Sequence, residues 1–172
     1  MSDRTPDFEN NLLRILQGKK PQRATSFELI VNGEFICRLA GHKQEQEGML
    51  GDLRLKVEAS LKAGYDIATC LASDLRLRPR EREMDKTTSL NGNSLITDWE
   101  SFEKYPWQDV ENTDFSHLEK IVPYMPNGMK LCIMGPDGVL ENVINIVGYD
   151  NLCFMLYEEP NLVQAIFANV GS

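Results

Sequence analysis

The chain has 172 residues, of which 42% are hydrophobic and 26% are charged, and it carries a formal net charge of −8. A chain of this length and composition can bury a core and fits one ordinary soluble domain. Its negative charge argues against a nucleic-acid backbone as the main partner, because such binding depends on clustered lysine and arginine. No apolar run approaches the roughly 20 residues that a membrane-spanning helix needs. We therefore expect a partner that is neither nucleic acid nor membrane.

The N-terminus and the cysteines indicate the compartment. The first residues lack the apolar stretch and the cleavage site of a secretory signal. The four cysteines are widely spaced and form no C-x-x-C pair, which is typical of reduced thiols. We therefore expect a cytoplasmic protein.

In the first half of the chain, helices are predicted to alternate with strands. Thr5-Pro6 offers a cap and a first turn for a helix. Residues 26–31 have the composition of a strand. Apolar residues at helical spacing predict a helix over 50–62, and the nearly continuous apolar content of 65–72 predicts a strand that is buried on both faces.

The second half begins with a polar, highly charged excursion at 74–98. A short amphipathic turn at 99–105 follows, and a third buried strand is predicted at 129–134. Helices are expected at 139–147, at 152–157 and after Pro160. This alternation is typical of parallel α/β architecture, and a sheet of so few strands would leave apolar edges uncovered.

Three segments, taken in order, resemble the uroporphyrinogen decarboxylase superfamily, which includes the methylcobalamin:coenzyme M methyltransferases. Residues 13–23 (LRILQGKKPQR) are similar to the "R-x-L-x-G-x-x-P-D-R" opening of its decarboxylase-like branch. Residues 99–107 (WESFEKYPW) resemble that branch's "W-x-x-F-E-x-Y-P-W". Residues 135–163 resemble its "G-P … G-x-E-N-x-x-x-x-L-Y-x-D-P-x-L-V".

The resemblance implies a fold and an extent. The family folds as a (β/α) barrel of about twice this length, in keeping with the usual size of such barrels. We therefore expect residues 1–172 to form a single α/β domain, the N-terminal half of a TIM-type barrel, with about three to four parallel strands and flanking helices. Such a half barrel is expected to be incomplete as an enzyme. It is also expected to form a homo-oligomer or to pair with a missing C-terminal half.

In a barrel, reactive groups stand at the carboxyl ends of the strands. Residues 65–75 resemble the decarboxylase's second strand, whose final aspartate faces the pyrrole nitrogens of the substrate. The resemblance therefore implies Asp74 as the catalytic residue, because a carboxylate can accept several N–H bonds and stabilise a protonated pyrrole. The same strand-end rule predicts four substrate-binding residues: Glu28, Asn32, Ser73 and Asp137.

One departure from the family pattern bears on the activity. True decarboxylases carry "R-Q-A-G-R" just after the first strand, and its arginines clamp substrate carboxylates. Here the corresponding region, residues 28–34, reads ELIVNGE, with a carboxylate where the cation should be. This favours corrinoid-linked methyl transfer, or the activity of an uncharacterised relative, over porphyrinogen decarboxylation.

The resemblance also raises the question of a metal. The methyltransferase relatives activate a thiol with zinc held by histidine and cysteine. This chain offers only His42 and His117, with no H-x-C, so we expect no metal site and no cofactor within it. Zinc or a corrinoid partner is an expectation for the full-length parent.

Three functions stay open at this point. The parent activity is corrinoid-linked methyl transfer or is uncharacterised; or it is true uroporphyrinogen decarboxylation in porphyrin biosynthesis; or the chain is a non-catalytic half barrel that acts through self-association or a partner. A self-sufficient small α/β binding domain would require the 74–98 excursion to cover the edges of the sheet.

Overall fold

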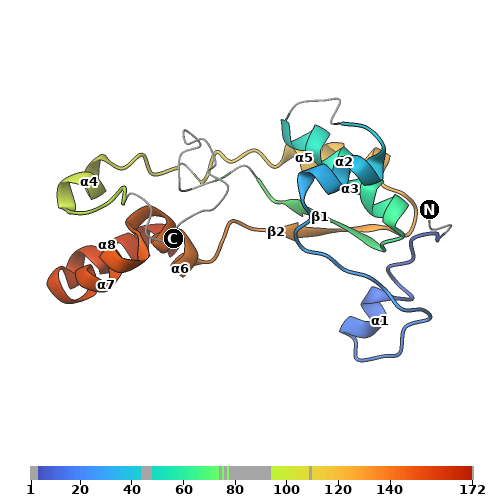
Figure 1. The fold of residues 1–172 in the computed structure, drawn as a ribbon, viewed down its shortest axis with the longest axis horizontal. Coiled ribbons are helices and arrows are strands. Elements are labelled where there is room, and N and C mark those ends of the chain that lie inside the picture. The colour runs from blue at the N-terminus through green and yellow to red at the C-terminus, as the bar shows by residue number, and fades with distance from the viewer. Residues whose placement is uncertain are drawn as a thin grey trace. The chain divides into compact units, whose positions relative to one another are not determined.

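The computed structural model describes residues 4–43, 48–73, 75, 77, 94–108 and 110–171. The chain divides into two compact units (Figure 1). We call Met1–Asp74 with Asp114–Gly135 the sheet unit, and Leu75–Thr113 with Pro136–Ser172 the helical unit.

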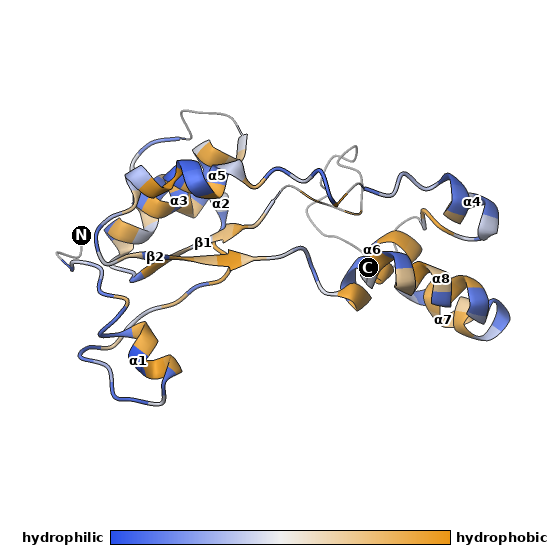
Figure 2. Cartoon of the chain, turned by 180° about the vertical axis from the view of Figure 1, so that it is seen from behind, coloured by the Kyte–Doolittle hydropathy of each residue, from blue (hydrophilic) through white to orange (hydrophobic). Residues whose placement is uncertain are grey.

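The sheet unit is built on two parallel strands, β1 (Ile67–Leu71) and β2 (Lys130–Met134). They pair in register from Ile67 opposite Lys130 to Leu71 opposite Met134. Both strands are largely apolar in sequence, as Figure 2 shows by colour. The strands predicted at 65–72 and 129–134, and their parallel pairing, are thereby confirmed.

One face of the sheet packs against α3 (Gly48–Ala63). Leu53 and Val57 of this helix form a buried cluster with Ala68 and Cys70 of β1. Ile121, which lies between α5 (Ser116–Lys120) and the 3-10 helix η1 (Val122–Tyr124), is fully buried in the same cluster. Each large apolar side chain that is fully buried in this cluster stabilises the unit by about 1.5–3 kcal/mol.

The helix α2 (Gly33–Ala40) lies on α3 and occupies a stretch whose sequence leaves a short strand or a helical turn open over residues 35–39. Its Ile36 and Ala40 form a second buried cluster with Leu55 and Ala59 of α3. The helix ends at Gly41, whose φ of 82° is a left-handed conformation that glycine adopts without a Cβ clash. The first helix, α1 (Leu12–Leu16), begins further along the chain than the start at Thr5-Pro6 that the sequence predicts.

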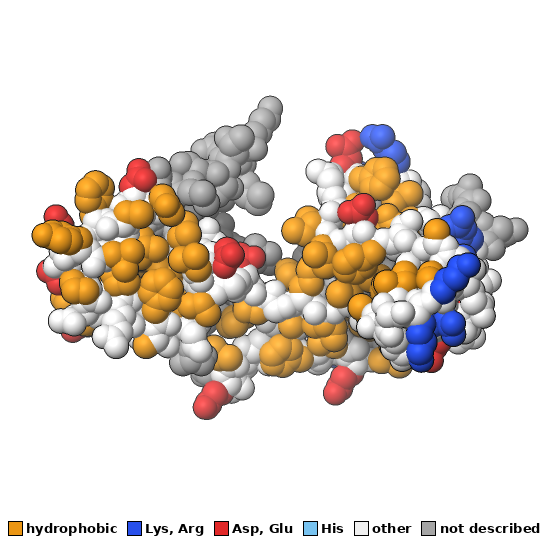
Figure 3. Space-filling model, turned by 90° about the horizontal axis from the view of Figure 1, so that it is seen from below, with side chains coloured by type: hydrophobic (Ala, Val, Ile, Leu, Met, Phe, Trp, Pro, Cys, Tyr) orange, Lys and Arg blue, Asp and Glu red, His pale blue; other side chains and the backbone are white. Residues whose placement is uncertain are grey.

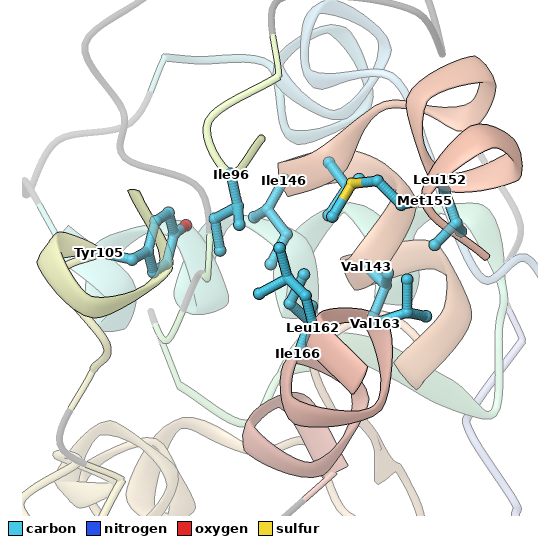
Figure 4. Close-up of a cluster of buried hydrophobic side chains, with 10 residues drawn as sticks. Ile96, Tyr105, Val143, Ile146, Leu152, Met155, Leu162, Val163 and Ile166 are labelled. Atoms are coloured by element: carbon cyan, nitrogen blue, oxygen red, sulfur yellow. The ribbon is translucent and has the colours of Figure 1, made fainter. Parts of the chain in front are cut away.

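The described residues of the helical unit form α4 (Trp99–Lys104) and three further helices, α6 (Val139–Val147), α7 (Tyr149–Glu158) and α8 (Pro160–Gly171). Gly148, with a φ of 84°, ends α6 and precedes α7. Figure 4 shows side chains of α6, α7 and α8 meeting Ile96 and Tyr105 in one buried core. The largest fully buried side chains of this core are Ile96, Ile146, Leu162 and Ile166.

The predicted partial barrel with three to four strands is wrong. Among the described residues the sheet contains two strands, and helices dominate the rest. The strand predicted at 26–31 does not form: these residues lie outside the sheet, and Ile30 is 85% exposed. A strand requires a neighbour for its backbone hydrogen bonds, and local apolar composition does not supply one. Most of the predicted excursion at 74–98 lies outside the described residues.

Candidate functional site

Two buried polar side chains meet the carboxyl end of β1. Ser73, two residues beyond the strand, is 7% exposed, and His117 of α5 is 6% exposed. The His117 Nε2 lies 3.2 Å from the Leu71 carbonyl oxygen, the last of the strand. Because a carbonyl only accepts, Nε2 carries the proton of this hydrogen bond. We call Ser73 and His117 the strand-end pair.

The position of His117 is fixed by the turn that precedes α5. The Asp114 carboxylate accepts hydrogen bonds from the Ser116 backbone N–H at 2.7 Å and from the Ser116 hydroxyl at 3.1 Å. The backbone bond is the larger cause, and the hydroxyl bond the next, of an Asp114 pKa below its ordinary value. A backbone hydrogen bond also joins the carboxyl ends of the two strands, because the Ala72 N–H donates to the Met134 carbonyl at 2.7 Å.

The other predicted site residues have separate surroundings. Asp74 lies outside the described residues, so its catalytic role stays a prediction. Asp137 belongs to the helical unit and is exposed, and its backbone carbonyl accepts a hydrogen bond from the Asn142 side chain at 2.6 Å. Glu28 is exposed. Asn32 caps α2, its Oδ1 accepting from the Glu34 N–H at 2.9 Å. Substrate binding by these residues stays a prediction.

A buried ionic cluster, missed at the sequence level, stands at the amino end of β1. The Asp66 side chain is fully buried and accepts three hydrogen bonds: from the Asp7 N–H at 2.7 Å, from Arg23 Nη2 at 2.5 Å and from the Thr25 hydroxyl at 2.8 Å. The amino ends of parallel strands ordinarily serve stability rather than chemistry. A lone aspartate directly before an apolar strand is a sequence signal that could have indicated it.

A pocket of about 350 Å³ opens on α3, lined also by His42, Tyr124 and Pro126. At its rim the Glu58 carboxylate lies 2.8 Å from His42 Nε2 and accepts a hydrogen bond from Lys62 Nζ at 2.7 Å. Arg54 stacks over the Tyr124 ring at 4.2 Å. The i,i+4 spacing of Glu58 and Lys62 predicts their pairing, but no sequence pattern places His42 beside them.

The described residues hold no group of three histidine, cysteine or acidic side chains that could bind a metal ion. In the same residues, no helix has the length and apolar content to cross a membrane.

Comparisons with protein-family models, with curated proteins and with solved structures found no match for this chain.

Proposed function

We propose that the chain is a component of a uroporphyrinogen decarboxylase-superfamily enzyme, with corrinoid-linked methyl transfer as its activity, and that its substrate-facing edge is the carboxyl end of β1. The proposal rests on the three resembling segments and on one structural observation, the buried strand-end pair. In parallel α/β sheets, ligands bind beyond the carboxyl ends of the strands. His117 serves there as a positioning residue, and Asp74, which follows Ser73 in the sequence, is the proposed catalytic carboxylate.

The charge of residues 28–34 favours methyl transfer over decarboxylation in this proposal. A porphyrinogen carries many carboxylates, which require arginine clamps. Glu28 and Glu34 occupy the region where the decarboxylases have those arginines, and both are exposed.

The four cysteines are free thiols, which suits the cytoplasmic location that belongs to this proposal.

Ligand binding tests the proposed activity. We expect methylcobalamin to raise the melting temperature of the chain, and uroporphyrin, an oxidised stand-in for the porphyrinogen, to leave it unchanged, because a ligand stabilises the folded state it binds. The Asp74→Asn variant should show a smaller methylcobalamin shift. Stabilisation by uroporphyrin instead would favour the decarboxylase, and no shift with either compound would overturn the proposal.

We also propose that the chain works in association with a second copy of itself. The sheet has two strands, so each strand has an edge that is unpaired with any described strand. The same unit presents an irregular segment, residues 26–31, with Phe27, Leu29 and Ile30 exposed. An unpaired strand edge can accept an apolar segment of this kind as an added strand, and a pair of copies can exchange such segments. Figure 3 shows hydrophobic side chains at the surface of each unit.

A single charge in the exposed segment tests this association. We expect the wild-type chain to form a dimer that dissociates on dilution, and Ile30→Lys to weaken it at least tenfold, which is about 1.4 kcal/mol. Ser26→Lys, at an exposed polar position of the same segment, adds the same charge and should change the dimer little. Light scattering with size-exclusion chromatography measures both. A wild-type chain that stays monomeric at every concentration would refute self-association.

A further inference from the structure

Each ring nitrogen of His42 has a hydrogen-bond acceptor beside it. Its Nδ1 lies 2.7 Å from the Lys43 carbonyl oxygen, and its Nε2 lies 2.8 Å from Glu58 Oε2. A carbonyl and an ionised carboxylate can only accept. A neutral imidazole has one N–H and can satisfy one of these acceptors, whereas the imidazolium satisfies both. The folded chain therefore favours His42 in its charged form.

Glu58 is shared between two cations. Its Oε1 accepts from Lys62 and its Oε2 from His42. These bonds hold the Glu58 pKa below its ordinary value, with Lys62 as the larger cause and His42 as the next. Lys62 Nζ also donates to the carbonyl of Ala40, the last residue of α2. Glu58 and Lys62 on α3 thus bind the end of α2 and the chain just beyond it.

We propose that His42, Glu58 and Lys62 form a pH-sensitive clasp, which fastens the chain after α2 onto α3 and sets the shape of the α3 pocket. His42 and Glu58 both line that pocket. When His42 loses a proton, one of these two hydrogen bonds is lost and the contact with Glu58 is no longer an ion pair, so the attachment of the chain from Gly41 to Lys43 to α3 weakens. This clasp is independent of the strand-end pair and of the proposed activity.

The charged groups around His42 set the limits of the clasp. From α3 it faces Glu58, with Lys62 bound to the same carboxylate, and Arg54 lines the same pocket. From η1, Tyr124 lines the pocket and carries Arg54 on its ring. From α2, Arg38 pairs with Glu34 on an exposed surface. The sequence also has Glu45 and Glu47 in the connecting segment, outside the described residues.

The stability that the clasp contributes falls at both low and high pH, for a different reason in each case. The lowered Glu58 pKa means that its contribution is fully present above the unfolded-chain value of about 4.3 and is lost as the pH falls through the lower folded value. The two His42 bonds favour the imidazolium. Their contribution is present below the unfolded-chain value of about 6.5 and is lost as the pH rises through the folded midpoint. The clasp is therefore strongest between these limits.

Titration of the histidine rings by NMR tests the clasp, and the chain has only two histidines to assign. We expect Glu58→Gln to lower the His42 midpoint by about 0.5–1 pH unit, since it removes an adjacent opposite charge from a pair that is more than a third exposed. Asp52→Asn is the matched control, because it removes a carboxylate that pairs with Lys56 on the same helix. It should leave the His42 midpoint within about 0.2 unit.

Hydrogen exchange supplies a readout of the fastening itself. After correction for the intrinsic rate, the protection of the Gly41 amide, which donates to the Cys37 carbonyl at 2.9 Å, should fall as the pH rises through the His42 midpoint. His42→Gln should abolish that dependence. The clasp would be overturned by an unchanged titration midpoint of His42 in Glu58→Gln. It would also be overturned if the exchange protection of the Gly41 amide did not change as the pH passes that midpoint. Neither result would bear on methylcobalamin binding.

Discussion

Replacement of Asp66 by asparagine should lower the free energy of unfolding of the sheet unit by about 3 kcal/mol. The carboxylate is fully buried and accepts from Asp7, Arg23 and Thr25 at once. Asparagine keeps the shape but carries no charge, so it accepts more weakly from the Asp7 N–H and from Arg23, and its Nδ2 forces the Thr25 hydroxyl to change from donor to acceptor. It also leaves the Arg23 guanidinium, 27% exposed, without its counter-ion. Removal of one partner from a buried pair costs more than the pair itself contributes.

Urea unfolding with two probes can separate the units. Both tryptophans, Trp99 and Trp107, belong to the helical unit, so their fluorescence reports that unit, while far-UV circular dichroism reports both. Asp66→Asn should shift the dichroism transition and spare the fluorescence transition. Glu34→Gln is the control, since Glu34 and Arg38 form a pair that is 83% and 74% exposed and contributes little. Equal effects from the two variants would contradict the importance of the buried cluster.

The sequence predicts the parts of the fold that depend on local pattern. The two strands have continuous apolar runs, and α3 has apolar residues at helical spacing, so each can be recognised without its neighbours. The 26–31 segment has a comparable local pattern, yet it lies outside the sheet. Its state depends on whether another strand edge pairs with it, which is a non-local condition.

The candidate site divides in the same way. Ser73 could be predicted because a residue just beyond a strand lies at the strand's carboxyl end. His117 could not, because it reaches the Leu71 carbonyl from a helix 46 residues further along the chain. Likewise, no sequence spacing predicts that Asp66 binds Arg23 and Thr25. Polar contacts across long sequence separations depend on the packing of whole elements.

The core of the helical unit is the second place where a large effect is expected. Leu162 is fully buried and packs in one cluster with Val143, Ile146 and Ile166. Leu162→Ala should lower the free energy of unfolding of this unit by about 3 kcal/mol, from lost transfer energy and from the cavity left behind. The shift should appear in tryptophan fluorescence.

A leucine on the surface of the same unit supplies the matched control for Leu162→Ala. Leu156 of α7 is 56% exposed, and Leu156→Ala removes the same atoms from a site that is already hydrated, so it should change stability by less than about 0.5 kcal/mol. A unit this small has a low free energy of unfolding, so a loss of this size can prevent Leu162→Ala from folding. A milder variant is therefore needed. Ile166→Val, which removes one methylene, provides a graded step of about 1 kcal/mol. If Leu156→Ala destabilised the unit as much as Leu162→Ala, the helices would not be packed around Leu162, because a cost that depends on burial must differ between a buried and an exposed leucine.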